Sequence, residues 1–356
     1  MQHTVLITGA AGYVGTMLVR RFAARGDVAV VIGLDKEPVP DLIKDEPKLV
    51  YIERNTADEW EGEVAKHAPD IIVHAAWQIR AIYNNEKLTW KWNIEGSDKV
   101  FAYAFSHPEV ARLVHFSTVA SYGAFPDNTL EHRFTEDEPF RKTDYLYAEE
   151  KRIAEERLQA AYERSDKRVA VSIIRPAAIT GPRGRFMRIR FGLQAALSGS
   201  LKGQRSFVYD LVSLLVSWVP VTKKWLRQFI HEDDIVGLVE RLTFGPLVPG
   251  YEIFNACPPG PAVLGKDMAK AVGKRTLPVY PWMIRIAYFL FWHLTRGKIP
   301  SSRGSWKSYS YPIAVDGAKA TNMLGYAYRY NSFDAFYYTN GEYESYVPEA
   351  LRRHKA

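Results

Sequence analysis

Cysteine is almost absent from this sequence. Its 356 residues include a single cysteine, Cys257. One thiol cannot build an internal disulfide framework or a cysteine-rich zinc site, so we expect Cys257 to be a small buried apolar side chain. Neither a His-Glu-x-x-His motif nor a Gly-x-Ser-x-Gly motif occurs, which argues against a zinc hydrolase and a serine hydrolase. We predict no metal site.

Long hydrophobic runs are also missing. The most apolar stretches, Leu211–Val221 and Ile286–Trp292, are shorter than the roughly 20 residues needed to span a bilayer. The apolar run at the N-terminus has no basic leader before it and is expected to be a strand rather than a signal peptide. We therefore predict a cytoplasmic protein with no membrane span, and leave association with a membrane surface open.

The charge is mildly positive and evenly spread. The formal net charge is +7, and the only dense basic cluster is Arg352-Arg353-His354-Lys355, within a tail at residues 348–356. An excess of this size is explained by attraction for an anionic cofactor or substrate. We predict a small-molecule partner and no binding of nucleic acid.

A glycine-spaced turn stands out near the N-terminus. A short apolar strand, Val5–Thr8, is followed by Gly9, Gly12 and Gly15 and then by a helix-compatible segment, 14–25. In a dinucleotide site such glycines make the tight turn, admit the pyrophosphate and allow close helix–strand packing, and the helix N-terminus faces the anion. The predicted cofactor contacts in this turn are Gly9, Gly12, Tyr13, Val14 and Gly15.

Strands and helices alternate through the first half of the chain, which is typical of a parallel sheet with helices on both faces. We predict an α/β fold, a Rossmann-type doubly wound parallel sheet with a smaller C-terminal substrate lobe. The expected strands are Val5–Thr8, Val28–Leu34, Leu49–Ile52, Ile71–His74, Leu113–Phe116 and Val169–Ile174, and the expected helices are 14–25, 57–67, 93–105 and 147–164.

The regular alternation fades after Arg175-Pro176. We predict that residues 1–180 form the dinucleotide domain and that 228–256 return to it, with 228–231 and 251–255 as strands of the core sheet. Residues 181–227 and 257–347 are predicted to form the substrate lobe. The aromatic stretch Val279–Trp292 is expected in the core of that lobe, as is Phe207–Trp225; a lipid-sized pocket or a membrane surface is the alternative.

Asp35 ends the second expected strand, twenty residues after Gly15. An acidic side chain at this position can accept hydrogen bonds from both ribose hydroxyls of NAD and would repel the 2′-phosphate of NADP. The sequence therefore predicts NAD as the cofactor. Lys36, the next residue, leaves NADP open.

Two Tyr-x-x-x-Lys pairs occur, Tyr147/Lys151 and Tyr83/Lys87. Residues four apart on a helix share one face, so an ammonium can lower the pKa of the phenol and make it a usable general acid or base. Tyr147 begins a long expected helix, whereas Tyr83 falls in a loop. We predict that Tyr147/Lys151 is catalytic and that the other pair is a coincidence.

Hydroxyl side chains follow the fifth expected strand. Ser117 and Thr118 come directly after Val114-His115-Phe116. A hydroxyl at the carboxyl end of a strand can donate a hydrogen bond to the reacting oxygen of a substrate. Thr118 is the predicted catalytic hydroxyl and Ser117 is the reserve.

These motifs together resemble the extended short-chain dehydrogenase/reductases, the group of the NAD-dependent epimerases and dehydratases such as UDP-glucose 4-epimerase. The match covers residues 4 to 255, and a weaker one extends it to about 326. The matching features are Thr8-Gly9-x-x-Gly12-x-x-Gly15, Asp35, Val73-His74-Ala75-Ala76, Asn93-Ile94-Glu95-Gly96, Ser117-Thr118 through Tyr122-Gly123, Tyr147-x-x-x-Lys151, Arg175-Pro176 with Gly181-Pro182, Phe229-Ile230-His231-x-x-Asp234, and Val315-Asp316 through Leu324-Gly325-Tyr326.

The resemblance implies roles for individual residues. Tyr147 would relay the proton, Lys151 would also hold the nicotinamide ribose, Thr118 would orient the substrate oxygen, and Asn93 would be a structural asparagine. Further implied cofactor contacts are Ala75, Ala76, Ser117, Pro176, Ala177, and Asn55 with Thr56, where the family has a Gly-Asp pair and Asp58 is an alternative. Trp77 and Arg227, the latter in the family's diphosphate-binding position, are implied substrate contacts. A homodimer is also implied.

The resemblance implies hydride exchange with NAD at a carbinol carbon. A nucleotide-sugar 4-epimerase is our first choice. Val119-Ala120 replaces the Asp-Glu pair of the 4,6-dehydratases, which argues against dehydration. The stretch Arg175-Pro176-Ala177-Ala178-Ile179 also resembles 3β-hydroxysteroid dehydrogenases, so an apolar alcohol or ketone is the alternative substrate. A non-catalytic NAD-binding regulatory protein ranks last.

Overall fold

The computed structural model describes residues 2–184, 218–271, 273–338 and 340–349. They form two compact units, each built from three stretches of chain. Unit 1 lies within residues 1–118, 150–175 and 236–254, and unit 2 lies within 119–149, 176–235 and 255–356. Residues 119–149, which the sequence analysis gave to the dinucleotide domain, thus belong to unit 2.

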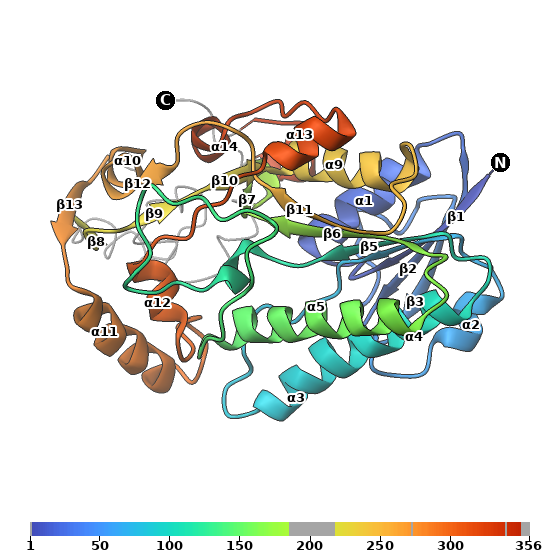
Figure 1. Cartoon of the computed structure of the whole chain (residues 1–356), viewed down its shortest axis with the longest axis horizontal. Helices are drawn as coiled ribbons and strands as arrows, with labels where there is room; N and C mark the ends of the chain where they lie inside the picture. Colours follow the sequence, from blue (N-terminus) through green and yellow to red (C-terminus); the bar gives the residue numbers. More distant parts are fainter. Residues whose placement is uncertain (1, 185–217, 272, 339, 350–356) are drawn as a thin grey trace. The chain divides into compact units, whose positions relative to one another are not determined.

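Unit 1 is built on a seven-stranded sheet (Figure 1). The pairs from β3 through β6 are parallel, which confirms the predicted α/β class and the Rossmann-type sheet. The expected strand at 251–255 also lies in this sheet, at its edge. In spatial order the strands are β11 (Tyr251–Ala256), β6 (Ala170–Pro176), β5 (Arg112–Phe116), β4 (Ile71–His74), β1 (His3–Thr8), β2 (Val28–Asp35) and β3 (Leu49–Glu53).

The strand order has a switch point beside β1. From β1 the chain proceeds outward to β2 and β3, and it then returns to the other side of β1 through β4, β5 and β6. Ligands of open parallel sheets bind beyond the carboxyl ends of the strands at such a reversal. The glycine turn follows the carboxyl end of β1, so the topology places it at the expected ligand position.

Helices cover both faces of the sheet in unit 1 (Figure 1). Helices α1 (Tyr13–Ala23) and α9 (Glu232–Phe244) lie on one face, and α3 (Glu86–Trp90), α4 (Gly96–Ser106) and α5 (Leu146–Arg164) lie on the other. The short α2 spans Glu61–Ala65. Both sheet faces are therefore buried, which explains the near-continuous apolar strands.

Helix α5 buries one face by its sequence periodicity. Ala154, Leu158 and Tyr162 recur every four residues and are all buried. Lys151 lies one turn before Ala154 on this same face and is buried as well. The apolar periodicity of the helix therefore carries the lysine into the interior of unit 1.

The strand expected at 228–231 is not part of the core sheet. The structure has β10 (Phe229–His231), which pairs in parallel with β7 (Ala178–Thr180) in unit 2. The prediction was wrong because unit 2 supplies the partners: the Gln228 amide accepts from Val315 N at 2.7 Å and donates to its carbonyl at 3.1 Å.

Unit 2 consists of short elements around its own apolar core. Val219, Trp225, Phe229, Val263 and Ala335 are among its buried side chains. Most of these elements are too short for sequence periodicity to reveal. They are η2 (Val119–Tyr122), β8 (Trp218–Val221), β9 (Leu226–Arg227), β12 (Val263–Leu264), α10 (Gly265–Ala271), β13 (Arg275–Pro278), α11 (Pro281–Leu294), α12 (Ser305–Ser310), α13 (Ala318–Leu324), α14 (Ser332–Tyr337) and η3 (Glu344–Tyr346), besides β7 and β10.

The aromatic stretch 279–292 does not enter the core of unit 2, so that prediction was wrong. Helix α11 covers most of it, and Ile284 is its only buried side chain. Trp282, Phe289 and Leu294 are 61%, 62% and 78% exposed. Of the similar stretch 207–225, residues 207–217 lie outside the described residues, while Val219, Val221 and Trp225 are in the core as expected.

No helix in the described ranges has both the length and the apolar character that crossing a membrane requires. Of the predicted basic tail, residues 350–356 lie outside the description, as do residues 185–217 of the predicted substrate lobe.

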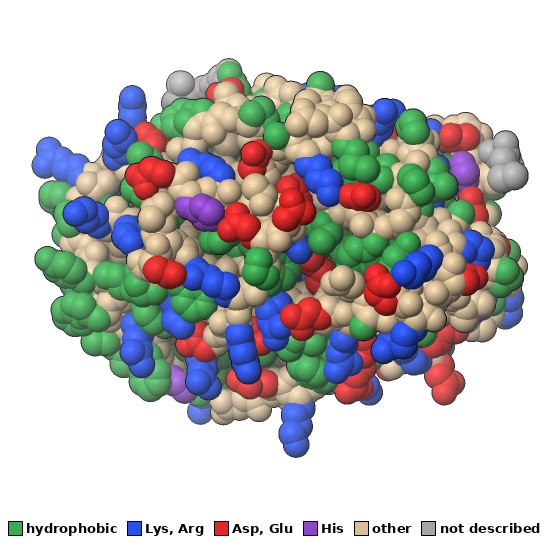
Figure 2. All heavy atoms as spheres, in the orientation of Figure 1, with side chains coloured by type: hydrophobic (Ala, Val, Ile, Leu, Met, Phe, Trp, Pro, Cys, Tyr) green, Lys and Arg blue, Asp and Glu red, His purple; other side chains and the backbone are tan. Residues whose placement is uncertain are grey.

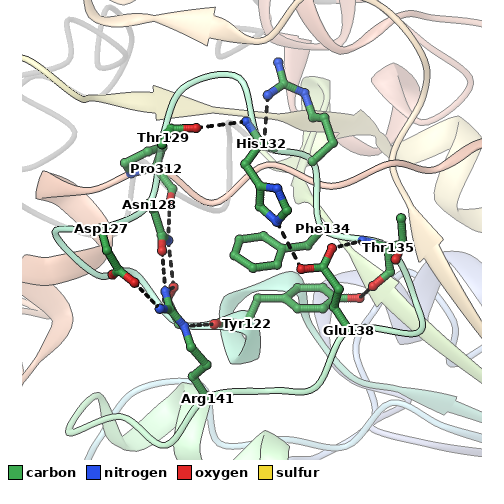
Figure 3. Close-up of polar contacts among 12 residues, drawn as sticks. Tyr122, Asp127, Asn128, Thr129, His132, Phe134, Thr135, Glu138, Arg141 and Pro312 are labelled. Atoms are coloured by element: carbon green, nitrogen blue, oxygen red, sulfur yellow. Dashed lines mark hydrogen bonds and ion pairs between the residues drawn. The ribbon is translucent and has the colours of Figure 1, made fainter.

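A polar network orders the chain segment after η2 (Figure 3). The Tyr122 hydroxyl lies 2.9 Å from the Thr135 carbonyl oxygen and 3.0 Å from Asn255 Oδ1, and its ring stacks on Phe134. Arg141 connects another part of this segment: its guanidinium donates a hydrogen bond to the Asp127 carboxylate at 2.8 Å. Buried hydrogen bonds thus replace regular secondary structure between η2 and α5.

We expect Tyr122→Phe to destabilise the protein. The phenol has one O–H, so the substitution removes one donor and leaves one of its two acceptors unsatisfied, which should lower the free energy of unfolding by about 1–3 kcal/mol. Chemical denaturation measures the change. Tyr280→Phe is the matched control, because the Tyr280 ring is exposed and its change should stay within about 0.5 kcal/mol. Equal stabilities for the two variants would contradict this role of Tyr122.

Candidate active site

Backbone atoms surround the glycine turn so closely that side chains on Gly9 and Gly15 would not fit. Gly9 has a φ of +74° and its N–H donates to the Leu34 carbonyl at 2.8 Å. A Cβ on Gly9 would lie 2.7 Å from Ala76 N, and one on Gly15 would lie 1.9 Å from the Gly9 carbonyl oxygen. The turn therefore packs directly against the backbone after β4 and against the first turn of α1.

Helix α1 begins without a side-chain cap. Its N-cap, Gly12, provides no side-chain hydrogen bond, and its first turn contains no acidic residue. Tyr13 and Val14 are the first two helical residues. The positive end of the helix dipole lies at these residues, and it would favour an anion such as a phosphate.

Asp35 lies beside the glycine turn, at the end of β2. One carboxylate oxygen accepts from Ala11 N and the other from Glu37 N, both at 3.0 Å. Burial raises the pKa of Asp35, and the two amide hydrogen bonds oppose this rise. Each oxygen can accept a second hydrogen bond, as a ribose diol requires. Lys36 contacts Glu37 and lies 5.0 Å from the Trp92 ring, so its charge is already partly compensated.

Lys151 is a buried ammonium at the carboxyl end of β5. Its Nζ donates to the Phe116 carbonyl oxygen and lies 3.7 Å from the centre of the Trp77 ring. Burial lowers the pKa of Lys151 to about 7, although Glu155 and Glu150 act in the opposite direction. Trp77, predicted as a substrate contact, here covers the ammonium by a cation–π interaction.

Asn93 connects the chain after β4 to α5. It lies in a single turn of π-helix, Lys91–Glu95, a feature frequently found at functional sites. Its amide accepts from Gln78 N at 2.7 Å and donates to Glu150 Oε2 at 2.7 Å. Glu150, a buried carboxylate whose pKa burial raises to about 7, was not predicted; its only signal in the sequence is the position next to Lys151.

The hydroxyl side chains after β5 are both buried. Ser117 donates its N–H to the Ile174 carbonyl at 2.7 Å, which continues the sheet pairing by one residue. Thr118 follows it as the last residue of this stretch of unit 1. Both residues thus directly follow Phe116, whose carbonyl Lys151 contacts.

Two neutral histidines lie in the sheet next to these groups. His74 bridges Thr8 Oγ1 at 2.7 Å and Ser97 Oγ at 2.9 Å, and its ring stacks on that of His115. Burial lowers the pKa of His74 to about 3 and that of His115 well below its usual value. His74 thus connects β1, β4 and α4 by hydrogen bonds without adding charge.

The other implied cofactor residues have separate environments. Asn55 and Thr56 form a turn in unit 1: Asn55 Oδ1 accepts from Ala57 N at 2.9 Å, and the Thr56 carbonyl accepts from Trp60 Nε1 at 2.9 Å. Pro176 ends β6 and Ala177 N donates to the Ala256 carbonyl at 3.0 Å in unit 2.

Tyr147 and Lys151 lie one turn apart in α5, whereas Tyr83 lies outside α3, which begins at Glu86. Only the first pair therefore has the helical spacing that the chemistry requires. Tyr147 packs near a second tyrosine of unit 2, with a ring-centre distance of 5.8 Å to Tyr145.

Arg227 lies among phenol side chains in unit 2. Burial raises the pKa of Tyr145, Tyr288 and Tyr309, and the Arg227 guanidinium opposes the rise in each case. Its Nη2 donates to the Ser308 carbonyl at 3.4 Å. This tyrosine cluster around the predicted substrate arginine was not found from the sequence, because its members come from four separate elements.

The residues of unit 1 fit a dinucleotide. Gly9 and Gly15 make backbone contacts too close for any Cβ, and the turn leads into the N-terminus of α1, which would favour an anion. Ser117 Oγ and Trp77 Nε1 are buried, and neither has a hydrogen-bond partner among the described residues. Such groups are costly unless a ligand or water satisfies them. For a metal, by contrast, no suitable group of His, Cys, Asp and Glu exists within the described residues.

Gly15→Ala should disrupt the turn and weaken NADH binding at least tenfold, because its Cβ would overlap the Gly9 carbonyl. Titration of NADH fluorescence measures the binding. Gly26→Ala is the matched control, since no heavy atom lies within 4 Å of a Cβ at that position. Unchanged NADH affinity in Gly15→Ala would exclude this turn as the cofactor site.

The buried charge of Lys151 should make stability depend on pH. Below pH 7 the lysine is charged in both states and the folded protein bears the full desolvation cost. Between its folded pKa of about 7 and the unfolded value, the unfolded state binds more protons, so stability rises with pH. Lys151→Met should therefore lose most of this rise, and thermal unfolding between pH 6 and 10 would show it. A parallel pH dependence in both proteins would contradict the buried charge.

Comparison with known proteins agrees with this geometry. The sequence pattern of the NAD dependent epimerase/dehydratase family matches residues 5–244. The match confirms the predicted family, NAD as its cofactor and an enzyme of the extended short-chain dehydrogenase/reductase type.

A curated relative from Escherichia coli O157:H7 is N-acetyl-alpha-D-glucosaminyl-diphospho-ditrans,octacis-undecaprenol 4-epimerase, 29% identical over 185 residues. The match covers 52% of this chain and 51% of the relative. This chain therefore aligns with about half the length of that relative.

Two solved structures share the fold. The Bordetella bronchiseptica enzyme WbmG, in complex with NAD and UDP, is similar with a TM-score of 0.65 and 19% identity, over 94% of this chain and 92% of the other. The UDP-glucuronic acid 4-epimerase of Bacillus cereus, in complex with UDP-glucuronic acid and NAD, has a TM-score of 0.65 and 16% identity, over 93% and 96%.

Proposed function

The chain belongs to the NAD dependent epimerase/dehydratase family, and on this premise we propose that it is a nucleotide-sugar epimerase of the 4-epimerase type. The observation that carries the proposal is the position of Lys151, a buried ammonium with a pKa of about 7, one helical turn after Tyr147. A positive charge this near a phenol favours the phenolate form that accepts a proton.

NAD, when bound, supplies a hydride acceptor at its nicotinamide ring. The Tyr147 phenolate takes the proton of the substrate hydroxyl as the carbinol C–H bond is broken and the carbonyl forms. Tyr147 would return this proton, and bound NAD would supply the reversible hydride exchange that inversion of the carbinol carbon requires. No external oxidant is consumed, so the reaction is balanced.

Other side chains position the reactants. Thr118 is proposed to donate a hydrogen bond to the reacting oxygen, with Ser117 as the reserve. Gly9, Gly12, Tyr13, Val14 and Gly15 would hold the pyrophosphate, and Asp35 the adenosine ribose. Lys151, Asn93, Ala75 and Ala76 are the proposed contacts of the nicotinamide half in unit 1. Pro176 and Ala177 are proposed as cofactor contacts as well. Asn55 and Thr56 would lie near the adenine, although their polar groups already have protein partners.

A diphosphate-linked sugar is the proposed substrate. Arg227, a cation in a group of tyrosines, provides the charge that a diphosphate requires, and the similar structures contain UDP or a UDP-sugar. The relative from Escherichia coli is named for a sugar on an undecaprenyl diphosphate. A polyprenyl-diphosphate sugar is therefore a second candidate, which the exposed apolar face of α11 favours.

Two other functions, oxidation of an apolar alcohol and non-catalytic regulation, explain the site less well. An apolar alcohol would leave the Arg227 charge without a partner in the substrate. A regulatory protein would not need Tyr147 together with Lys151. We further propose a cytoplasmic location. A homodimer formed through α4 and α5, which the family resemblance implies, is also proposed.

Tyr147→Phe should reduce epimerisation by about 100-fold or more, since general acid–base catalysis contributes about 10²–10⁴-fold. NADH binding should change little. Tyr83→Phe, in the other Tyr-x-x-x-Lys pair, is the matched control and should retain activity. The assay follows UDP-glucose, UDP-N-acetylglucosamine and UDP-glucuronic acid by chromatography, beside a polyprenyl-diphosphate sugar and a sterol alcohol.

The outcomes separate the candidates. Conversion of a UDP-sugar supports the first choice, and conversion of only the polyprenyl-linked sugar would replace it with the second. Oxidation of only the sterol would overturn both. Full activity of Tyr147→Phe would overturn the mechanism whatever the substrate.

A further inference from the structure

Helix α11 of unit 2 exposes an apolar face. Its outward side chains Trp282, Ile286, Phe289, Leu290 and Leu294 are between 47% and 78% exposed. They recur at helical spacing along one side of the helix, while Ile284 faces the protein. Figure 2 shows hydrophobic side chains gathered at the left of the molecule, where α11 lies in Figure 1.

The chain around α11 is strongly basic. Residues 268–315 contain eight Lys and Arg residues and no Asp or Glu. The whole chain has a net charge of only +7, so this segment accounts for the entire excess of positive over negative side chains. Arg285, Arg296, Lys298 and Arg303 are all exposed and lie within or shortly after α11.

The combination matches the chemistry of an anionic bilayer surface. A helix with an apolar side rich in Trp, Phe and Leu and with basic residues beside it lies in the plane of the headgroups. The basic residues are attracted to the negative surface of the membrane. Helix α11 has 14 residues, which suits a position in the surface plane rather than across the bilayer.

A second copy of this chain fits less well. An isologous contact through α11 would bring two basic segments without a carboxylate together, and their repulsion would oppose the apolar contact. An anionic lipid surface compensates the same charge. We therefore propose that α11 is a membrane-docking helix that binds the surface of bilayers containing anionic phospholipids.

The test uses the full chain loaded with NAD. Sedimentation with sucrose-loaded vesicles of phosphatidylcholine is compared with vesicles in which phosphatidylglycerol replaces one third of that lipid. The wild type should bind the anionic vesicles and remain in the supernatant with the neutral ones. Binding should weaken at high salt, because the charges are screened.

Two triple variants test the two parts of the surface. Ile286→Gln/Phe289→Gln/Leu294→Gln removes the apolar side, and Arg285→Gln/Arg296→Gln/Lys298→Gln removes the charge. Each should weaken vesicle binding at least tenfold. Circular dichroism and NADH binding show whether each variant is folded.

The matched controls replace exposed apolar or basic side chains at positions outside α11 and the basic segment. Leu247→Gln/Met323→Gln removes two exposed apolar side chains outside α11. Lys66→Gln/Lys142→Gln/Arg164→Gln removes the same amount of charge from other exposed positions. Both controls should bind anionic vesicles like the wild type.

Three results would overturn the proposal: no binding of the wild type to either vesicle, equal weakening by the control variants, or a dimer in sedimentation velocity that only the apolar variant dissociates and that does not bind vesicles. The last result would assign the face to a subunit interface. None of these readouts depends on turnover, so they are separate from the proposed reaction.

Discussion

The burial of the Lys151 ammonium is the interaction around which unit 1 is organised. An isolated charge in a protein interior is expensive unless it is paired or hydrogen-bonded. Here the Phe116 carbonyl at the end of β5 accepts its hydrogen bond, and the Trp77 ring covers it. Asn93 and Glu150 fix the neighbouring turn of α5. The cost lowers the lysine pKa to about 7, so the stability of the protein depends on the protonation of this one group above neutral pH.

Close backbone contact provides the second constraint. Gly9 and Gly15 bring the turn after β1 against Ala76 and the start of α1, so the amides of α1 and the carboxylate of Asp35 are positioned before any ligand arrives. Neutral His74 bridges two hydroxyl groups in the sheet beside them, and its ring stacks on that of His115. Preorganised donors of this kind lower the reorganisation needed when an anionic cofactor binds.

Unit 2 is stabilised differently from unit 1. Most of its regular elements are short, and many of its side chains form hydrogen bonds with the backbone. Tyr122, Asn255 and Asp234 each satisfy backbone or amide groups from distant parts of the chain. The His231-x-x-Asp234 motif is therefore structural in this unit, because Asp234 accepts from the amides of Arg329 and Tyr330. Its basic, apolar helix α11 remains available for a surface outside the protein.

The sequence alone determined the sheet of unit 1, the glycine turn, Asp35 and the Tyr147/Lys151 spacing, because each depends on residues close together in the chain. Local periodicity and backbone sterics do not need distant partners. Only the tertiary structure decided that Phe229–His231 pairs with β7, that Glu150 is bonded to Asn93, that tyrosines surround Arg227, and that α11 faces outward. These depend on contacts between segments far apart in sequence, and an apolar stretch has the same periodicity whether its face is buried or exposed.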